Sequence, residues 1–178
     1  MKIKQLLPIF LLLLCQSCLV DDTPERSFEE LPALTTEGAG MLAFNHQTES
    51  YIDDNGLTNV FYQLGSDGPQ LGLSTEWNNR AIISISIITV GVELEEGLTL
   101  DFGDREPGFA AYSFFYDDGN GSGASARSNS ETTGSITITH FDETNNIVSG
   151  TFSTEYIHPF TGDLVKITNG RFDTFFRR

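Results

Sequence analysis

The sequence predicts one all-β domain, an antiparallel β-sandwich or barrel of about 8–10 strands. Two features predict this class. From Gly40 onward, short runs rich in Ile, Val, Thr and Phe are separated by turn-forming residues about every eight to twelve positions, a spacing typical of sandwiches and barrels. Within these runs apolar and polar residues alternate with a period of two, and no segment has the period of a helix.

The clearest strand pattern is residues 81–90, where Ile83, Ile85 and Ile87 alternate with small or hydroxyl-bearing neighbours. One face of such a strand is apolar and the other carries hydroxyls, so we expect it near the centre of a sheet. The full set of expected strands is 40–47, 58–64, 70–75, 81–90, 97–103, 109–116, 133–140, 147–157, 163–169 and 171–176.

The C-terminal part of the chain is expected to form an antiparallel meander. Turn signals at residues 142–146, 158–163 and 169–170 join neighbouring strands, and pairing of sequence neighbours needs no crossover helix. Gly150 indicates a place where another backbone approaches closely, and Gly170 indicates a turn or a bulge.

The N-terminus has the pattern of an export signal, which we assign to residues 1–17. A short basic start precedes an apolar run at residues 6–14, which is too short to span a bilayer. The following Ser17-Cys18 resembles the lipobox of bacterial lipoproteins, which implies that Cys18 is the lipidated residue. The alternative is a redox pair of Cys15 and Cys18, but no βαβ pattern surrounds it.

Two further segments follow from composition. Residues 18–37 are acidic and contain prolines, so they predict a flexible tether, and residues 38–178 form the single β-domain. Asp21 and Asp22 follow Cys18 closely and resemble the acidic export signal of Bacteroidetes lipoproteins. The resemblance implies an exported protein that is anchored to the outer membrane and displayed at the cell surface; the alternative is a merely solvated linker.

The charge of the chain excludes one class of partner. The sequence has 10 Lys and Arg against 25 Asp and Glu, a formal net charge of −15, and −17 without residues 1–17. Binding of nucleic acid needs basic side chains that displace counterions from phosphates, so we expect no nucleic-acid partner. Membrane attachment is expected through the N-terminal lipid alone. The acidic surface serves solubility or attracts basic partners.

Three segments near the C-terminus resemble a known family. Gly134-Ser-Ile-Thr-Ile-Thr-His-Phe-Asp142, Asn146-Ile-Val-Ser-Gly-Thr-Phe-Ser153 and Val165-Lys-Ile-Thr-Asn-Gly-Arg-Phe-Asp173 are similar to the closing block of a family of uncharacterised Bacteroidetes lipoproteins, described only as a domain of unknown function. The resemblance extends over most of residues 36–176 and is sharpest over 134–176. It implies a location and a fold class and no activity.

One loop carries the residue types of a calcium site. Asp118, Asn120 and Ser122 stand at positions 1, 3 and 5 of a calcium-binding loop, and Gly123 stands at position 6. Asn129 occupies position 12, where such loops place a bidentate Glu, so a mobile hairpin loop is the competing interpretation. No other cofactor is expected.

Aromatic residues supply the candidate ligand-binding positions. Trp77, Tyr112 and Tyr116 would suit a platform on which a sugar stacks, although aromatic residues at alternate strand positions commonly belong to the core. Glu76 and Glu155 are the first candidates for a pair of catalytic acids, which a glycosidase needs across a cleft. The chain has no Gly-x-Ser-x-Gly motif of a serine hydrolase.

These observations favour a non-catalytic binding module over an enzyme. The expected partner is a glycan, a peptide or an envelope protein. Two alternatives stay open from the sequence: a lipocalin-like barrel that carries a small molecule or lipid, and a divergent hydrolase. An interior cavity would favour the carrier, an aromatic patch the binder, and a cleft with paired acids the enzyme.

Overall fold

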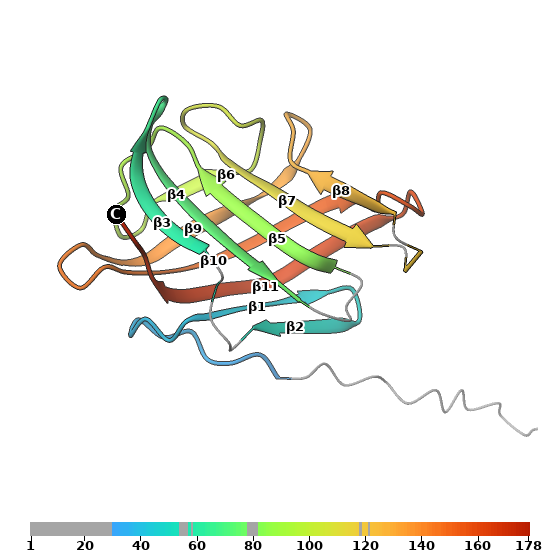
Figure 1. The fold of residues 1–178 in the computed structure, drawn as a ribbon, viewed down its shortest axis with the longest axis horizontal. Coiled ribbons are helices and arrows are strands. Elements are labelled where there is room, and N and C mark those ends of the chain that lie inside the picture. Colours follow the sequence, from blue (N-terminus) through green and yellow to red (C-terminus); the bar gives the residue numbers. More distant parts are fainter. Residues whose placement is uncertain (1–29, 54–56, 58, 78–81, 118, 121) are drawn as a thin grey trace, which may run out of the picture.

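The computed structural model describes residues 30–53, 57, 59–77, 82–117, 119–120 and 122–178. Within these residues the chain is all-β, with eleven strands in two antiparallel sheets (Figure 1), so the predicted fold class is confirmed. The described part contains no helix that is long and apolar enough to cross a bilayer. Cys18 and the predicted signal peptide lie outside the described residues.

Sheet A has six strands in the order β2-β1-β11-β10-β9-β6. Its last three long strands form the expected meander, and β11 then lies between β10 and β1, so the two ends of the domain meet in the middle of the sheet. The strands of sheet A are β1 (Met41–His46), β2 (Glu49–Asp53), β6 (Thr99–Asp101), β9 (Thr133–Asp142), β10 (Ile147–Ile157) and β11 (Leu164–Phe175).

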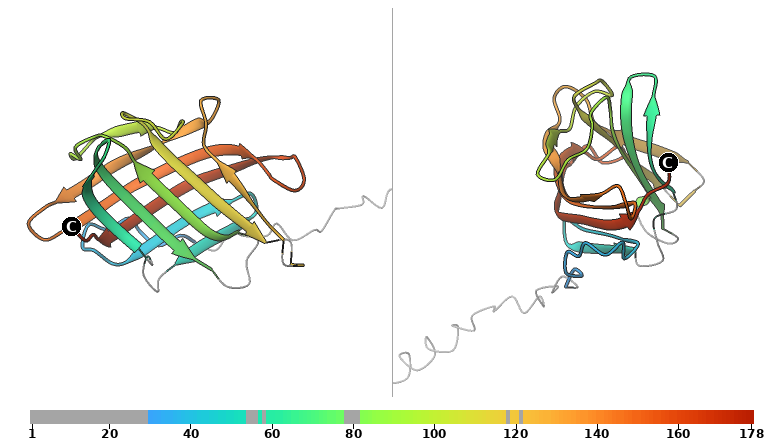
Figure 2. Two further views of the ribbon diagram at one scale, coloured as in Figure 1. Left: turned by 45° about the horizontal axis from the view of Figure 1, so that its top comes forward. Right: turned by 90° about the vertical axis from the view of Figure 1, so that its left-hand side faces the viewer.

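Sheet B has five strands in the order β3-β4-β5-β7-β8. They are β3 (Asn59–Gly65), β4 (Gly68–Glu76), β5 (Ile82–Thr89), β7 (Ala110–Asp117) and β8 (Gly123–Arg127). The two sheets pack face to face, as Figure 2 shows from the end of the molecule, and they do not close into a barrel. The barrel alternative is therefore wrong, and the lipocalin-like carrier lacks the closed barrel on which it depends.

The space between the sheets is filled by aromatic and aliphatic side chains from both inner faces. Phe44 of sheet A stacks on Tyr51 with ring centres 5.0 Å apart, and it also packs against Phe114 of sheet B at 6.3 Å. Phe114 stacks on Tyr156 of the opposite sheet at 5.0 Å. Aromatic pairs of this kind contribute about 0.5–1.5 kcal/mol each beyond their burial. Of the predicted apolar face of residues 81–90, Ile85 and Ile87 lie in this core, whereas a register shift after Ile82 places Ile82 there instead of Ile83.

Strand β11 is longer than the sequence predicted. The segments expected at 163–169 and 171–176 form one strand, because Asn169 and Gly170 make a bulge rather than a turn. Asn169 takes a left-handed conformation with φ of 54°. A Cβ at Gly170 would lie 2.5 Å from the carbonyl oxygen of Phe152, so only glycine fits against β10 there.

Asp173 joins the N-terminal entry segment to the last strand. Its carboxylate is fully buried and accepts five hydrogen bonds: from the hydroxyls of Thr35 (2.5 Å) and Ser149 (2.7 Å), and from the backbone N–H groups of Glu37 (3.1 Å), Gly38 (2.9 Å) and Ala39 (3.2 Å). Burial alone raises the pKa of Asp173, but the hydrogen bonds outweigh it and hold this pKa below its ordinary value of 3.8.

The end of the predicted tether therefore contacts the domain. In addition to the bonds from Thr35 and Glu37, the guanidinium of Arg171 donates to the carbonyl oxygen of Pro32 at 2.8 Å. Residues 32–39 thus run along the last strand and are held by it. Residues 18–29 of the predicted tether lie outside the described residues, so for them the tether stays a prediction.

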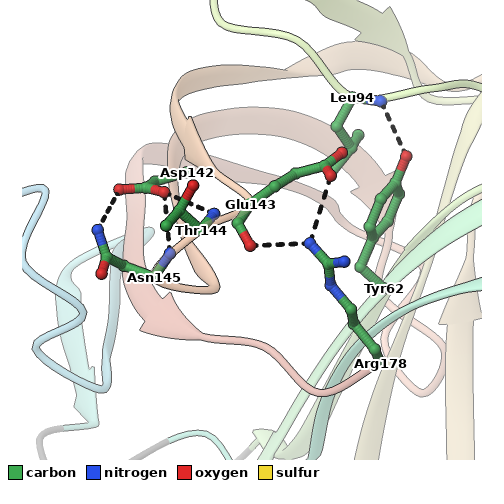
Figure 3. A network of polar contacts seen from close by, with 7 residues as sticks. All are labelled: Tyr62, Leu94, Asp142, Glu143, Thr144, Asn145 and Arg178. Atoms are coloured by element: carbon green, nitrogen blue, oxygen red, sulfur yellow. Dashed lines mark hydrogen bonds and ion pairs between the residues drawn. The ribbon is translucent and has the colours of Figure 1, made fainter.

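The C-terminus covers an edge of sheet B. Arg177 donates its N–H to the carbonyl oxygen of Val60 on β3 at 3.0 Å and accepts from the N–H of Tyr62 at 2.7 Å. Arg178 donates to the carbonyl oxygen of Glu143 in the β9–β10 turn at 2.8 Å, as Figure 3 shows. The same figure shows Tyr62 accepting from the N–H of Leu94 at 3.3 Å. The last residues thus join the two sheets at one end of the sandwich.

Candidate functional site

Strand β8 forms the edge of sheet B opposite β3, and its outer side pairs with no strand of the described residues. The N–H and carbonyl of Tyr112 both face this strand, since they bond to the hydroxyl and the N–H of Ser128. Alternation along an antiparallel ladder then turns the backbone groups of Ala124 and Ala126 toward β7. The backbone groups of Ser125 and Arg127 consequently point away from the sheet.

A cleft of about 460 Å³ lies beside this edge, and we call it the β8–β10 cleft. Tyr156 and Ile157, the last two residues of β10, form its other side; they extend beyond the first residue of β9, so within the described chain only β11 pairs with them. The residues lining the cleft are Tyr112, Ser125, Ala126, Arg127, Asn129, Glu131, Thr132, Thr133, Glu155, Tyr156, Ile157, Pro159 and Leu164.

The mouth of the β8–β10 cleft has an apolar rim. Ile157 is 59% exposed and Leu164 is 55% exposed, and the two are cross-strand partners at the loop end of the β10–β11 hairpin. Phe160, in the loop between these strands, is 46% exposed. Single exposed apolar residues are common on proteins, but three large ones within one hairpin end beside a cleft indicate a contact surface.

Beneath the cleft, Tyr156 belongs to a buried polar cluster with His46 and Tyr116. The two phenols hydrogen-bond each other, and the imidazole Nε2 lies 3.1 Å from the Tyr156 hydroxyl and 3.3 Å from the Tyr116 hydroxyl. Burial raises the pKa of both phenols far above their ordinary range. Burial also lowers the pKa of His46, and His158 adds to this against the opposing effect of Glu49.

The cluster is therefore uncharged near neutral pH. Neither phenol ionises in that range, and the imidazole stays neutral and accepts a hydrogen bond from a phenol. His46 is buried and does not line the cleft, so its imidazole does not face a ligand there. We interpret the cluster as a satisfied polar network that fixes the position of β10 against β7, and thus the shape of the cleft floor.

The cleft does not contain the expected pair of acids. Glu155 lines it, but its Oε1 accepts an ion pair from Lys166 at 2.7 Å. Glu76 ends β4 in sheet B and does not line this cleft. Glu131 is the second acid of the cleft, and the sequence did not single it out.

The three aromatic candidates do not form an exposed platform. Tyr112 and Tyr116 are 4% and 1% exposed and belong to the core, as the competing interpretation of their spacing predicted. Trp77 is partly buried, with its ring edge-on to Phe44 at 5.8 Å and to Tyr51 at 5.6 Å. Of the three, only Tyr112 lines a cleft among those described.

The calcium hypothesis concerns a loop that the structure describes in part. Asp118 lies outside the described residues, while Asn120 and Ser122 are exposed in the loop between β7 and β8. Among the residues that are described, no three His, Cys, Asp or Glu side chains gather as a metal ion would require. The calcium site thus stays a prediction from the sequence.

Comparisons with models of protein families, with curated proteins and with solved structures yield no match. The resemblance to Bacteroidetes lipoproteins consequently stays an expectation from the residues. Of the candidates from the sequence, Tyr112 and Glu155 line the cleft, but the residues of its edge strand and apolar rim were missed. The run Gly123-Ala-Ser-Ala126 has small side chains and no apolar alternation, so it carries little strand signal, and Ile157 and Leu164 read as ordinary strand residues.

Proposed function

We propose that this protein is a lipid-anchored surface lipoprotein whose β-domain is a non-catalytic binding module. We propose further that it binds an extended peptide segment of a partner protein in the β8–β10 cleft. One observation carries this proposal: an unpaired strand edge, an open cleft and an exposed apolar rim lie together at one place in the fold.

Strand addition explains why these three features would serve one ligand. Ser125 and Arg127 each offer an outward N–H and an outward carbonyl, which an added strand would pair. Main-chain bonds of this kind supply affinity, and pockets for alternate side chains supply specificity. Ile157 and Leu164 would contact apolar side chains of the peptide, while the cleft beside them would receive one of its larger side chains.

Charge supports a particular kind of peptide. The chain beyond residue 17 has a formal net charge of −17, and long-range attraction would raise the rate at which a basic segment associates with it. Glu131 lines the cleft and has no ion-pair partner among the described residues. A peptide with apolar residues and a basic residue opposite Glu131 therefore fits the site best, whereas Arg127, which also lines the cleft, disfavours a basic residue beside the end of β8.

The test uses the chain from residue 18 with Cys18→Ser, and a displayed library of random peptides selected on it. Binding peptides are then measured against two variants. Ser125→Pro removes the outward N–H at an edge position where proline is tolerated, and Ser125→Ala removes only the hydroxyl. We expect Ser125→Pro to weaken binding about tenfold, the value of one hydrogen bond of about 1.4 kcal/mol, and Ser125→Ala to leave it unchanged.

Equal affinity of the proline variant and the parent chain would contradict strand addition at β8. Size-exclusion chromatography of the same proteins tests a further occupant. A stable dimer that Ser125→Pro dissociates would mean that a second copy of this chain, rather than a partner peptide, pairs with the edge.

The anchor is tested in the cell. Lipid chains contribute about 0.8 kcal/mol for each buried CH₂ group, so a chain acylated at Cys18 partitions into detergent. We expect Cys18→Ser to move the protein to the aqueous phase, whereas Cys15→Ser should not. Unchanged detergent partitioning of the Cys18 variant would exclude acylation at this residue.

A further inference from the structure

Basic side chains are scarce in this protein, and two of them line one cleft. The sequence has 10 Lys and Arg, against 25 acids. Arg105, in the loop between β6 and β7, and Arg127, at the end of β8, both line a second cleft of about 400 Å³. We call it the arginine cleft. Its remaining lining residues are Ser86, Ile88, Ala111, Tyr112, Ser113 and Ser128.

Strand register explains why hydroxyls accompany the arginines. Ser86, Ser113 and Arg127 are successive cross-strand partners on β5, β7 and β8. Their neighbours Ile85 and Phe114 are buried in the core, so the three side chains stand on the outer face of sheet B. The row therefore presents two hydroxyls and a guanidinium side by side across adjacent strands.

Both arginines lack an acidic partner. Within the described residues no carboxylate lies within 4.0 Å of either guanidinium, and neither side chain makes a hydrogen bond. The hydroxyls of Ser86 and Ser113 likewise make no hydrogen bond in the described part. By contrast, Arg178 is paired with Glu143. In so acidic a chain, two unpaired guanidiniums at one cleft leave a concentrated set of hydrogen-bond donors exposed.

We propose that the arginine cleft binds an oxyanion: a sulfate, phosphate or carboxylate group, either as a free ion or as a substituent of a saccharide. Guanidinium groups match oxyanions because their fixed N–H groups donate in pairs, and the serine hydroxyls add donors in the same direction. The cleft lining contains no acid that would repel the ligand. Arg127 and Tyr112 line both clefts, but the two proposals use different groups: anion binding uses the guanidiniums and hydroxyls, whereas peptide binding uses the outward backbone of β8.

The net charge of the protein opposes anion binding but does not prevent it. At an ionic strength of about 0.15 M the field of a surface charge decays over about 8 Å, so distant acids are screened. Asp104 and Glu106 flank Arg105 in the sequence and are exposed, and they are the acids closest along the chain to the site. The attraction of the two guanidiniums for an anion must exceed the repulsion of the anion by these two carboxylates. A ligand that contacts both guanidiniums at once is therefore favoured.

The test is calorimetric titration of the chain from residue 18 with Cys18→Ser, at constant ionic strength maintained with chloride. The probes are inorganic sulfate, a sulfated disaccharide and the same disaccharide without sulfate. We expect saturable binding of at least one of the two sulfate-bearing probes and none of the unsulfated disaccharide. Arg105→Gln and Arg127→Gln should each weaken it about tenfold or more, the effect of one lost charge-assisted hydrogen bond.

Arg178→Gln is the matched control, because it changes the charge by the same amount at an exposed residue outside the cleft. We expect it to change affinity less than about twofold.

Tighter binding of the sulfated disaccharide than of sulfate would place the anion on a saccharide, and the reverse order would identify a free ion; both support the site. Three results would overturn the proposed oxyanion site. They are equal weakening by Arg178→Gln, equal binding of the unsulfated disaccharide, and no saturable binding of either sulfate-bearing probe. Arg105 lies outside the β8–β10 cleft, so its variant leaves peptide binding intact.

Discussion

Replacing Asp173 with Asn should strongly destabilise the domain. The carboxylate accepts three bonds at Oδ2 and two at Oδ1. In the Asn variant one of these atoms becomes an NH₂ group, which cannot accept. If the remaining oxygen occupies the Oδ2 position, the N–H of Gly38 loses its acceptor; in the other orientation the N–H groups of Glu37 and Ala39 lose theirs.

The magnitude follows from these losses. A buried donor without an acceptor costs about 1–3 kcal/mol, and each bond that persists becomes weaker without the charge. We therefore expect Asp173→Asn to lower the free energy of unfolding by about 3 kcal/mol. For a domain of this size the melting temperature should fall by about 6–12 °C. Asp101→Asn, the same change at an exposed residue of β6, should shift neither quantity measurably.

Urea denaturation followed by tryptophan fluorescence measures the free energy of unfolding of both variants, made in the chain from residue 18 with Cys18→Ser. Its dependence on pH tests whether the charge of the Asp173 carboxylate is the cause of the difference. The pKa of Asp173 is lower in the folded state than its ordinary value of 3.8, so its stabilisation is complete above about pH 4 and declines as the pH falls through the folded pKa. The difference between parent and Asn variant should shrink in acid. A difference below about 1 kcal/mol at neutral pH, or one that acid leaves unchanged, would refute the reasoning.

Two further predictions concern the core of sheet A. Because burial lowers the folded-state pKa of His46 below 6.5, stability should decline as the pH falls below about 6.5, and His46→Gln should flatten this decline in urea titrations; an identical slope in both proteins would contradict it. A Cβ at Gly150 would lie 2.4 Å from the carbonyl oxygen of Thr137, so Gly150→Ala should cost about 3 kcal/mol by denaturation. Gly162→Ala, with φ of 77° and no atom within 4 Å, should cost only about 1 kcal/mol, and similar losses in both would exclude the steric cause.

The period-two pattern predicted the fold class because a strand that buries one face alternates apolar and polar residues in its sequence. Strands β2 and β8 show no such alternation, and the sequence did not predict them. Strand β8 contributes mainly alanine and serine, and β2 ends at Asp53, a buried carboxylate that accepts a hydrogen bond from Thr75. Asn169 and Gly170 left a turn and a bulge both open, since the residue types that suit a tight turn also suit a bulge.

The candidate sites were harder to predict because they depend on distant residues. Arg105 and Arg127 reach one cleft only through the path of the β6–β7 loop and the register of β7 with β8. Likewise, Ser125 has an outward backbone only because β8 ends the sheet, which depends on strand order rather than on local sequence. Local sequence did anticipate the core positions of Tyr112 and Tyr116, since alternate aromatic residues commonly face inward.

The central place of β11 determines when this protein can acquire its structure. Within the described part of the chain, strands β1 and β10 are joined only by β11, which pairs with both of them, and Phe176 follows β11 and belongs to the core. Forming such long-range contacts is slow, because the chain loses the conformational entropy of a large loop before the strand pairs contribute favourable free energy. Sheet A therefore cannot be completed before β11 has been synthesised, because a chain that ends before this strand has nothing to pair β1 with β10.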